Sequence, residues 1–166
     1  MTRTCGRWSL LLGLLLLAGT GCGGDDPTGP SDPVAPDRIR VQHVLIGFLV
    51  PPGPGESEGH SSVPGRMITR SREEAIDLAG RILLVANGGA SFDSLVTVYS
   101  EDSFPGIYGI SNFGVSPDRT QNEYGRGEFV EAFGDVGFGL SVGGIGLAEY
   151  DPLRSPFGWH VIRRLS

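Results

Sequence analysis

Two short runs of β-branched and aliphatic residues stand at opposite ends of a region in which apolar and polar positions alternate in helical or strand-like patterns. The first run, 38–50, contains Val41-Gln42-His43-Val44, and the second, 157–165, contains Trp159-His160-Val161-Ile162. Such runs predict strands. Strands from the two ends of a small domain often pair at its centre, so we expect His43 and His160 to meet in one site.

Two amphipathic helices are predicted between these strands. Ser71 followed by Glu74 has the spacing of a capping box, and Asn87-Gly88-Gly89 ends the helix that follows. Apolar positions in it recur at three- and four-residue steps, at Ala75, Leu78, Ala79, Ile82 and Ala86. Ser91 can cap a second helix, which carries Phe92, Leu95, Val96 and Tyr99 on one face.

The second half of the chain predicts a glycine-rich strand or loop at 107–116, a polar insertion at 117–127 and a short helix at 128–140. Two last strands follow at 143–150 and 157–165. The long segment 51–65, rich in proline and glycine, predicts a loop. This order of elements indicates an α+β domain, in which helices surround a small, mostly antiparallel sheet.

The first 37 residues differ from the rest in composition. Arg3 and Arg7 precede an apolar stretch at 8–18 that is short for a membrane span. The small residues just before Cys22 resemble a bacterial lipoprotein signal, in which Cys22 would be lipidated after removal of residues 1–21. An ordinary secretory signal and an uncleaved anchor remain alternatives. Residues 22–37 predict a flexible tether, and residues 38–166 one folded domain.

Charge and cysteine content narrow the classes of function. The formal net charge is −6, and it becomes about −8 without Arg3 and Arg7, which argues against nucleic acid as a partner. The two cysteines are Cys5, inside the signal, and Cys22, so we expect neither an internal disulfide nor a catalytic thiol. His60 with Glu56 and Glu58 matches no metal-binding spacing, and we expect no metal and no cofactor.

Six segments, in their order along the chain, resemble the parvulin family of peptidyl-prolyl isomerases. They are QHVLI, SREEA, GGASFDSLVTVYSED, SNFG, RGEFVEAFGDVGFGL and SPFGWHVI, between residues 42 and 162. The last segment most resembles the bacterial extracytoplasmic foldases of that family. The resemblance implies a parvulin-like fold of the FKBP-like superfold and rotation of X–Pro peptide bonds without a cofactor.

The resemblance also implies roles for single residues. Four match the polar catalytic groups of the family, namely His43, Asp102, Ser155 and His160. Three match the apolar wall that receives the proline ring, namely Phe113, Phe129 and Phe133. The alternatives are structural: histidines and phenylalanines at such spacings are often core residues, and Asp102 and Ser155 could be turn residues.

The chain departs from the family pattern at three places. Residues 109–112, Gly-Ile-Ser-Asn, replace the glycine-glycine-aspartate stretch of the family. An insertion at 117–124 would lie beside the pocket that receives the proline ring. The loop at 51–65 lacks a basic cluster, and only Arg66, Arg70 and Arg72 lie near its end, so we expect no requirement for phosphoserine.

Together these features predict a lipid-anchored, extracytoplasmic prolyl isomerase that acts on proline-containing unfolded or secreted polypeptides. Gly23, directly after Cys22, is not the aspartate that retains some lipoproteins at the inner membrane, so we expect the outer membrane or its periplasmic face. The alternative is a non-catalytic chaperone or peptide-binding lipoprotein with the same fold.

Overall fold

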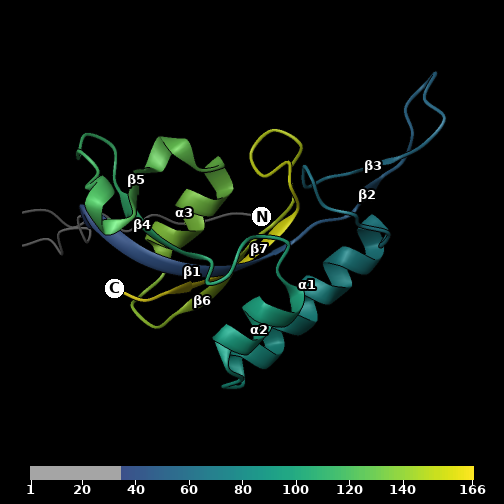
Figure 1. Cartoon of the computed structure of the whole chain (residues 1–166). Coiled ribbons are helices and arrows are strands. Elements are labelled where there is room, and N and C mark those ends of the chain that lie inside the picture. The colour runs from purple at the N-terminus through teal and green to yellow at the C-terminus, as the bar shows by residue number, and fades with distance from the viewer. Residues whose placement is uncertain (1–34) are drawn as a thin grey trace, which may run out of the picture. The chain divides into compact units, whose positions relative to one another are not determined.

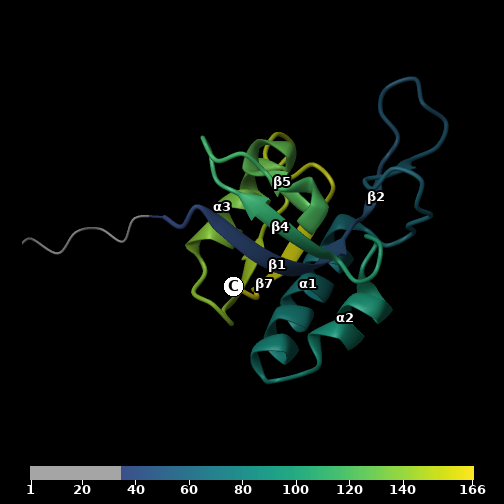
Figure 2. The same cartoon turned by 60° about the vertical axis from the view of Figure 1, so that its left-hand side comes forward.

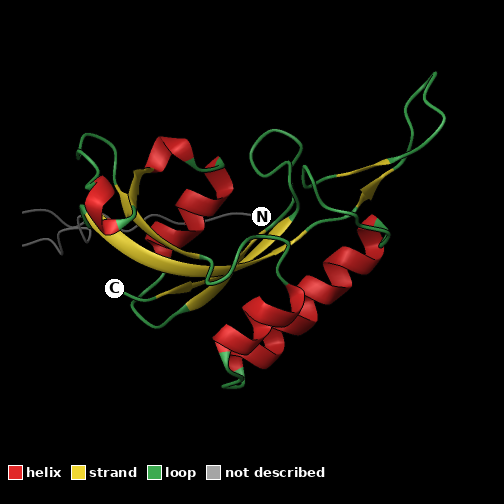
Figure 3. Cartoon of the chain, in the orientation of Figure 1, coloured by secondary structure: helices red, strands yellow, loops and turns green. Residues whose placement is uncertain are grey.

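A five-stranded sheet forms the centre of the computed structural model, which describes residues 35–166 (Figure 1, Figure 3). Its strand order is β5-β4-β1-β7-β6. The strands are β1 (Arg38–Ile46), β4 (Ile107–Ser111), β5 (Glu123–Gly125), β6 (Ile145–Ala148) and β7 (Trp159–Arg164). All neighbours are antiparallel except β4 and β5. The expected signal, Cys22 and most of the expected tether lie outside the described residues.

The predicted pairing of the first and last strands is confirmed. The register of β1 and β7 runs from Val41 opposite Arg164 to Ile46 opposite Trp159. His43 lies opposite Ile162, and His160 lies opposite Leu45. Leu45 lies two residues after His43 on β1, so both side chains point to the same face of the sheet. His160 lies opposite Leu45 and shares that face, so the two histidines are diagonal neighbours.

Helices cover both faces of the sheet (Figure 2). On the face of the histidines, Ile39, Val41 and Ile162 form a core with helix α3 (Glu131–Gly139). On the opposite face, Val44 and other buried residues pack against helices α1 (Arg72–Asn87) and α2 (Phe92–Tyr99). From Val41 to Ile46 every residue of β1 is buried, because helices cover both faces of the sheet there.

The predicted starts of the first two helices agree with the structure, because their capping signals are local, whereas the helix expected at 128–140 begins at Glu131. The Ser71 side chain accepts a hydrogen bond from the Glu74 amide, and the Glu74 side chain accepts one from the Ser71 amide. Ser91 caps α2 through the amide of Ser94. Among residues 35–166, no helix is both long enough and apolar enough to cross a membrane.

The structure corrects two parts of the predicted pattern. The strand expected at 38–50 ends at Ile46, and its last two residues form β2 (Leu49–Val50). This short strand pairs in a separate hairpin with β3 (His60–Ser61), which lies inside the expected loop. The chain leaves the sheet at Gly47, where an added Cβ would lie 2.6 Å from side-chain atoms of Val63 and Ile68. The expected polar insertion at 117–127 supplies two short 3₁₀ turns, η1 (Arg119–Gln121) and η2 (Arg126–Glu128), and the edge strand β5.

Gly158 allows the end of β1 to approach the start of β7. Its φ of 138° lies in the region that favours glycine, and an added Cβ would collide with the carbonyl oxygen of Ile46. We therefore expect Gly158→Ala to lower the free energy of unfolding by at least about 2 kcal/mol in urea titrations.

Gly80, inside α1, is the matched control. Apart from its chain neighbours and the backbone of its own helix, no atom lies within 4 Å of a Cβ added at Gly80. Gly80→Ala should raise the free energy of unfolding by about 0.5–1 kcal/mol, because alanine costs less chain entropy in a helix. Equal effects of the two substitutions would contradict the assigned contact at Gly158.

Candidate functional site

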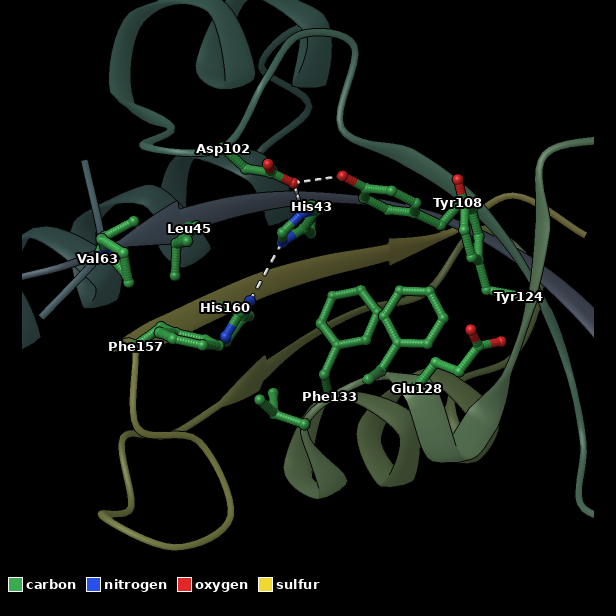
Figure 4. Close-up of a pocket in the computed structure, with 13 residues that line it drawn as sticks. His43, Leu45, Val63, Asp102, Tyr108, Tyr124, Glu128, Phe133, Phe157 and His160 are labelled. Atoms are coloured by element: carbon green, nitrogen blue, oxygen red, sulfur yellow. Dashed lines mark hydrogen bonds and ion pairs between the residues drawn. The ribbon is translucent and has the colours of Figure 1, made fainter. Parts of the chain in front are cut away.

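A cavity of about 490 Å³ opens on the sheet face that carries both histidines (Figure 4). Strands β1 and β7 contribute His43, Leu45 and His160 to its lining. The remaining lining is mainly aromatic or aliphatic and comes from several segments, with Tyr108, Tyr124, Phe129, Val130, Phe133, Phe157, Val63 and Pro64. Two carboxylates, Asp102 and Glu128, complete it. The cavity therefore combines a large apolar surface with a few polar groups, as small-ligand sites do.

The polar groups form a hydrogen-bonded row. The Nδ1 atoms of His43 and His160 lie 3.2 Å apart, and Nε2 of His43 lies 2.8 Å from Oδ2 of Asp102. Sheet register brings the histidines together, and the segment after α2 brings Asp102 to them. The backbone amide of Glu101 anchors that segment by donating to the Leu45 carbonyl at 2.9 Å. The two predicted histidines and the predicted aspartate thus meet in one place.

Asp102 is held in its ionised form. Burial raises the pKa of its carboxyl group, but hydrogen bonds from His43, Tyr108 and the Ser103 amide outweigh burial and bring the pKa well below its usual range. An ionised carboxylate only accepts hydrogen bonds, so Nε2 of His43 donates to it. A neutral His43 then accepts at Nδ1, and Nδ1–H of His160 is the donor.

This arrangement leaves a lone pair on Nε2 of His160. That nitrogen is buried and has no hydrogen-bond partner among residues 35–166. Burial, and then the charge of His43, lower the pKa of His160 to about 3, although Asp102 acts in the opposite direction. His160 is therefore neutral at neutral pH, and the row carries one negative charge, at Asp102, when His43 is neutral.

Aromatic rings adjoin the polar row on the side of α3. Phe129 and Phe133 stack with their centroids 5.3 Å apart. Phe133 contacts the His43 ring edge-on at 5.0 Å and the His160 ring at 5.3 Å. Phe133 is almost fully buried, so it supports the histidines from the core as well as lining the cavity. Such a surface can enclose a small apolar ring next to a carboxylate.

Two predicted site residues do not line this cavity. Ser155 is fully buried, and its hydroxyl donates to the Gly158 carbonyl at 2.9 Å, which stabilises the turn before β7. Phe113 is 72% exposed, and the Arg126 guanidinium lies 5.1 Å from its ring centroid. The Ser155 side chain thus closes a turn, and the Phe113 side chain extends into solvent.

Sequence reasoning missed Tyr108, Tyr124, Glu128 and Phe157 as lining residues. Tyr108 lies opposite Val41, two residues from His43, so it reaches the histidine face only through the β1–β4 register. In the sequence, the only sign was weak: Tyr108 and Ile110 are two residues apart, as side chains on one face of a strand are. Tyr124 lies on β5, in the segment expected to be a polar insertion.

No cluster of three or more histidine, cysteine, aspartate or glutamate side chains within residues 35–166 could hold a metal ion. The side chain of His43 is hydrogen-bonded to those of His160 and Asp102.

Comparison with known proteins gives one family and a similar structure. Residues 31–165 match the family model described as the PPIC-type PPIASE domain. Among solved structures, the chain is similar to the peptidyl-prolyl isomerase ESS1 from Candida albicans, with a TM-score of 0.50 and 20% identity. The match covers 78% of this chain and 63% of that one, and supports the predicted α+β fold. No curated protein matches the chain.

The depressed pKa of His160 predicts a pH-dependent stability. Between the ordinary value of 6.5 and the folded value of about 3, the unfolded state binds one proton more than the folded state. The free energy of unfolding should therefore fall as the pH drops below about 6.5, by up to about 1.4 kcal/mol per pH unit. Asp102 acts in the same direction, but only below its ordinary value of 3.8.

Urea titrations of His160→Gln across the same pH range should show a shallower slope than the unmodified chain. His60→Gln is the matched control, since His60 is exposed on the β2–β3 hairpin and should leave the slope unchanged. An unaltered slope in His160→Gln would mean that His160 is not the group responsible.

Proposed function

Because the chain belongs to the family of PPIC-type peptidyl-prolyl isomerases, the parvulins, we propose that it accelerates rotation about X–Pro bonds in polypeptide substrates. The observation that carries this proposal is the juxtaposition of an aromatic cavity with the Asp102–His43–His160 row. The cavity can hold a proline ring while the preceding peptide bond lies beside the row.

The reaction demands positioning and charge complementarity. Rotation must overcome a barrier of about 18–20 kcal/mol, because twisting the amide removes its resonance. No covalent bond forms or breaks, so this chemistry calls for no cofactor. The site must bind the twisted amide more tightly than either planar isomer. Burying the proline ring against Phe129 and Phe133 supplies on the order of 1–3 kcal/mol of binding.

Asp102 acts electrostatically in this proposal. A planar amide carries partial negative charge on its oxygen, and the twisted amide loses much of that charge. A fixed carboxylate close to this oxygen therefore disfavours the planar forms relative to the twisted one. His43 and His160 orient the carboxylate and shape the floor of the site. Both cysteines, Cys5 and Cys22, precede the domain, so nucleophilic attack by a thiol plays no part.

The substrates are proline segments without a phosphate requirement. Arg70 donates to the Gly47 carbonyl at 3.0 Å and is ion-paired with Glu101. Arg119 donates to both oxygens of Glu128 at 2.8 Å. These arginines are engaged within the chain, and the carboxylate of Asp102 would repel a phosphate. This charge distribution supports unmodified polypeptides as substrates.

The cellular setting completes the proposal. The apolar stretch and Cys22 support a lipoprotein signal, and a lipid on Cys22 would hold the domain at an extracytoplasmic membrane face through residues 23–37. The isomerase would then assist the folding of secreted or envelope proteins.

The activity is tested by NMR exchange measurements on an X–Pro peptide series with the full chain. We expect clear acceleration by the unmodified chain and a loss of at least about tenfold in Asp102→Ala, with peptide binding retained. Asp77→Ala is the control, because Asp77 is an exposed residue of α1. A normal rate in Asp102→Ala would refute the site. Binding without acceleration by the unmodified chain would favour a non-catalytic chaperone.

The lipid anchor is tested by labelling a bacterial culture that expresses the chain with a radioactive fatty acid. The chain should incorporate the label, and Cys22→Ala should abolish incorporation, because only a mature N-terminal cysteine is modified. Cys5→Ala, in the removed signal, should keep the label. Labelling of Cys22→Ala, or an unlabelled chain that is nevertheless secreted, would contradict the lipoprotein assignment.

A further inference from the structure

Tyr108 connects the aromatic wall of the cavity to its polar row. Its hydroxyl donates to Oδ2 of Asp102 at 2.7 Å, and its ring centroid lies 5.6 Å from that of Phe129. The same ring lies 5.7 Å from the His43 ring. Figure 4 shows the Tyr108 and His43 side chains reaching the Asp102 carboxylate from different directions.

Two donors converge on one oxygen of Asp102. Oδ2 accepts from Nε2 of His43 at 2.8 Å and from the Tyr108 hydroxyl at 2.7 Å, while Oδ1 accepts from the Ser103 amide at 2.7 Å. A carboxylate oxygen has two lone pairs, so these donors occupy both lone pairs of Oδ2. Three donors in fixed positions leave the carboxylate little freedom to rotate.

We propose that Tyr108 is a positioning residue of this site, whose hydroxyl fixes the Asp102 carboxylate in register with His43 while its ring forms part of the wall beside the bound segment. The inference rests on the proposed isomerase function.

The charges around the carboxylate agree with this role. His43 and His160 face it from β1 and β7, and Tyr124 lies beyond Tyr108, with 6.1 Å between their ring centroids. The nearby carboxylates are ion-paired, Glu101 with Arg70 and Glu128 with Arg119. Burial, and then the hydrogen bond and charge of Asp102, raise the pKa of Tyr108 above its usual range. The hydroxyl therefore keeps its proton and stays a donor.

Tyr108→Phe separates the two roles, because it keeps the ring and removes the donor. For an X–Pro peptide we expect KM to change by less than about twofold and kcat to fall about tenfold. Loss of a donor to the ionised form raises the pKa of Asp102, so the acid limb of the kcat/KM profile should move about one pH unit higher. Tyr99→Phe, an exposed tyrosine at the end of α2, is the matched control.

A readout independent of catalysis accompanies the kinetics. The titration midpoint of the Asp102 carboxyl carbon, followed by NMR in the full chain, should be higher in Tyr108→Phe than in Tyr99→Phe. Thermal unfolding of both variants checks that each is folded. An unchanged midpoint together with an unchanged pH profile would overturn the positioning role.

The same readout separates failure of this inference from failure of the proposed function. If the unmodified chain isomerises no peptide, the function fails, and the carboxyl titration alone decides the role of Tyr108. A raised midpoint would then support the hydrogen-bonded positioning of Asp102, and an unchanged midpoint would overturn it.

Discussion

The antiparallel pairing of β1 with β7 is the constraint on which the rest of the structure depends. It joins the two ends of the folded region and makes β1 the central strand, buried on both faces. The same pairing places His43 and His160 side by side although 117 residues separate them in sequence. The close approach at Gly158 belongs to this constraint, because a side chain there would push β7 away from the Ile46 carbonyl. Stability and the candidate site therefore rest on the same backbone contact.

The site is a polar row in a mostly apolar cavity, with two buried histidines and a partly buried Asp102. Hydrogen bonds join its members, and only Nε2 of His160 has no partner among residues 35–166. Taking a carboxylate out of water is costly unless hydrogen bonds replace the lost hydration. Asp102 accepts three such bonds, which keep it ionised despite its partial burial. His160 avoids the free-energy cost of a buried charge because burial keeps it neutral, and it is hydrogen-bonded to His43. When His43 is neutral, the row presents one fixed charge beside an aromatic wall, which is the combination that a twisting amide requires.

Segments outside the resemblance shape the cavity as much as the histidines do. The segment 117–124 departs from the family pattern, yet it supplies Tyr124 to the lining. Val63 and Pro64, beyond the β2–β3 hairpin, line it too. The Ser62 hydroxyl, next to Val63, donates a hydrogen bond to the Phe157 carbonyl at 2.8 Å.

The amino-acid sequence by itself determined the elements whose signals are local. Ser71 with Glu74 marked the start of α1, apolar periodicity marked the buried helix faces, and β-branched runs marked the two central strands. Its resemblance to the parvulins pointed to His43, Asp102, His160, Phe129 and Phe133, which line one cavity in the structure. Only the tertiary structure decided the course of the chain after Gly47, the burial of Ser155 in a turn, the exposure of Phe113 and the entry of Tyr108 into the site. The physical reason is that periodicity encodes which face of an element is apolar, whereas the register between strands and the packing of loops decide which side chains point into a shared cavity.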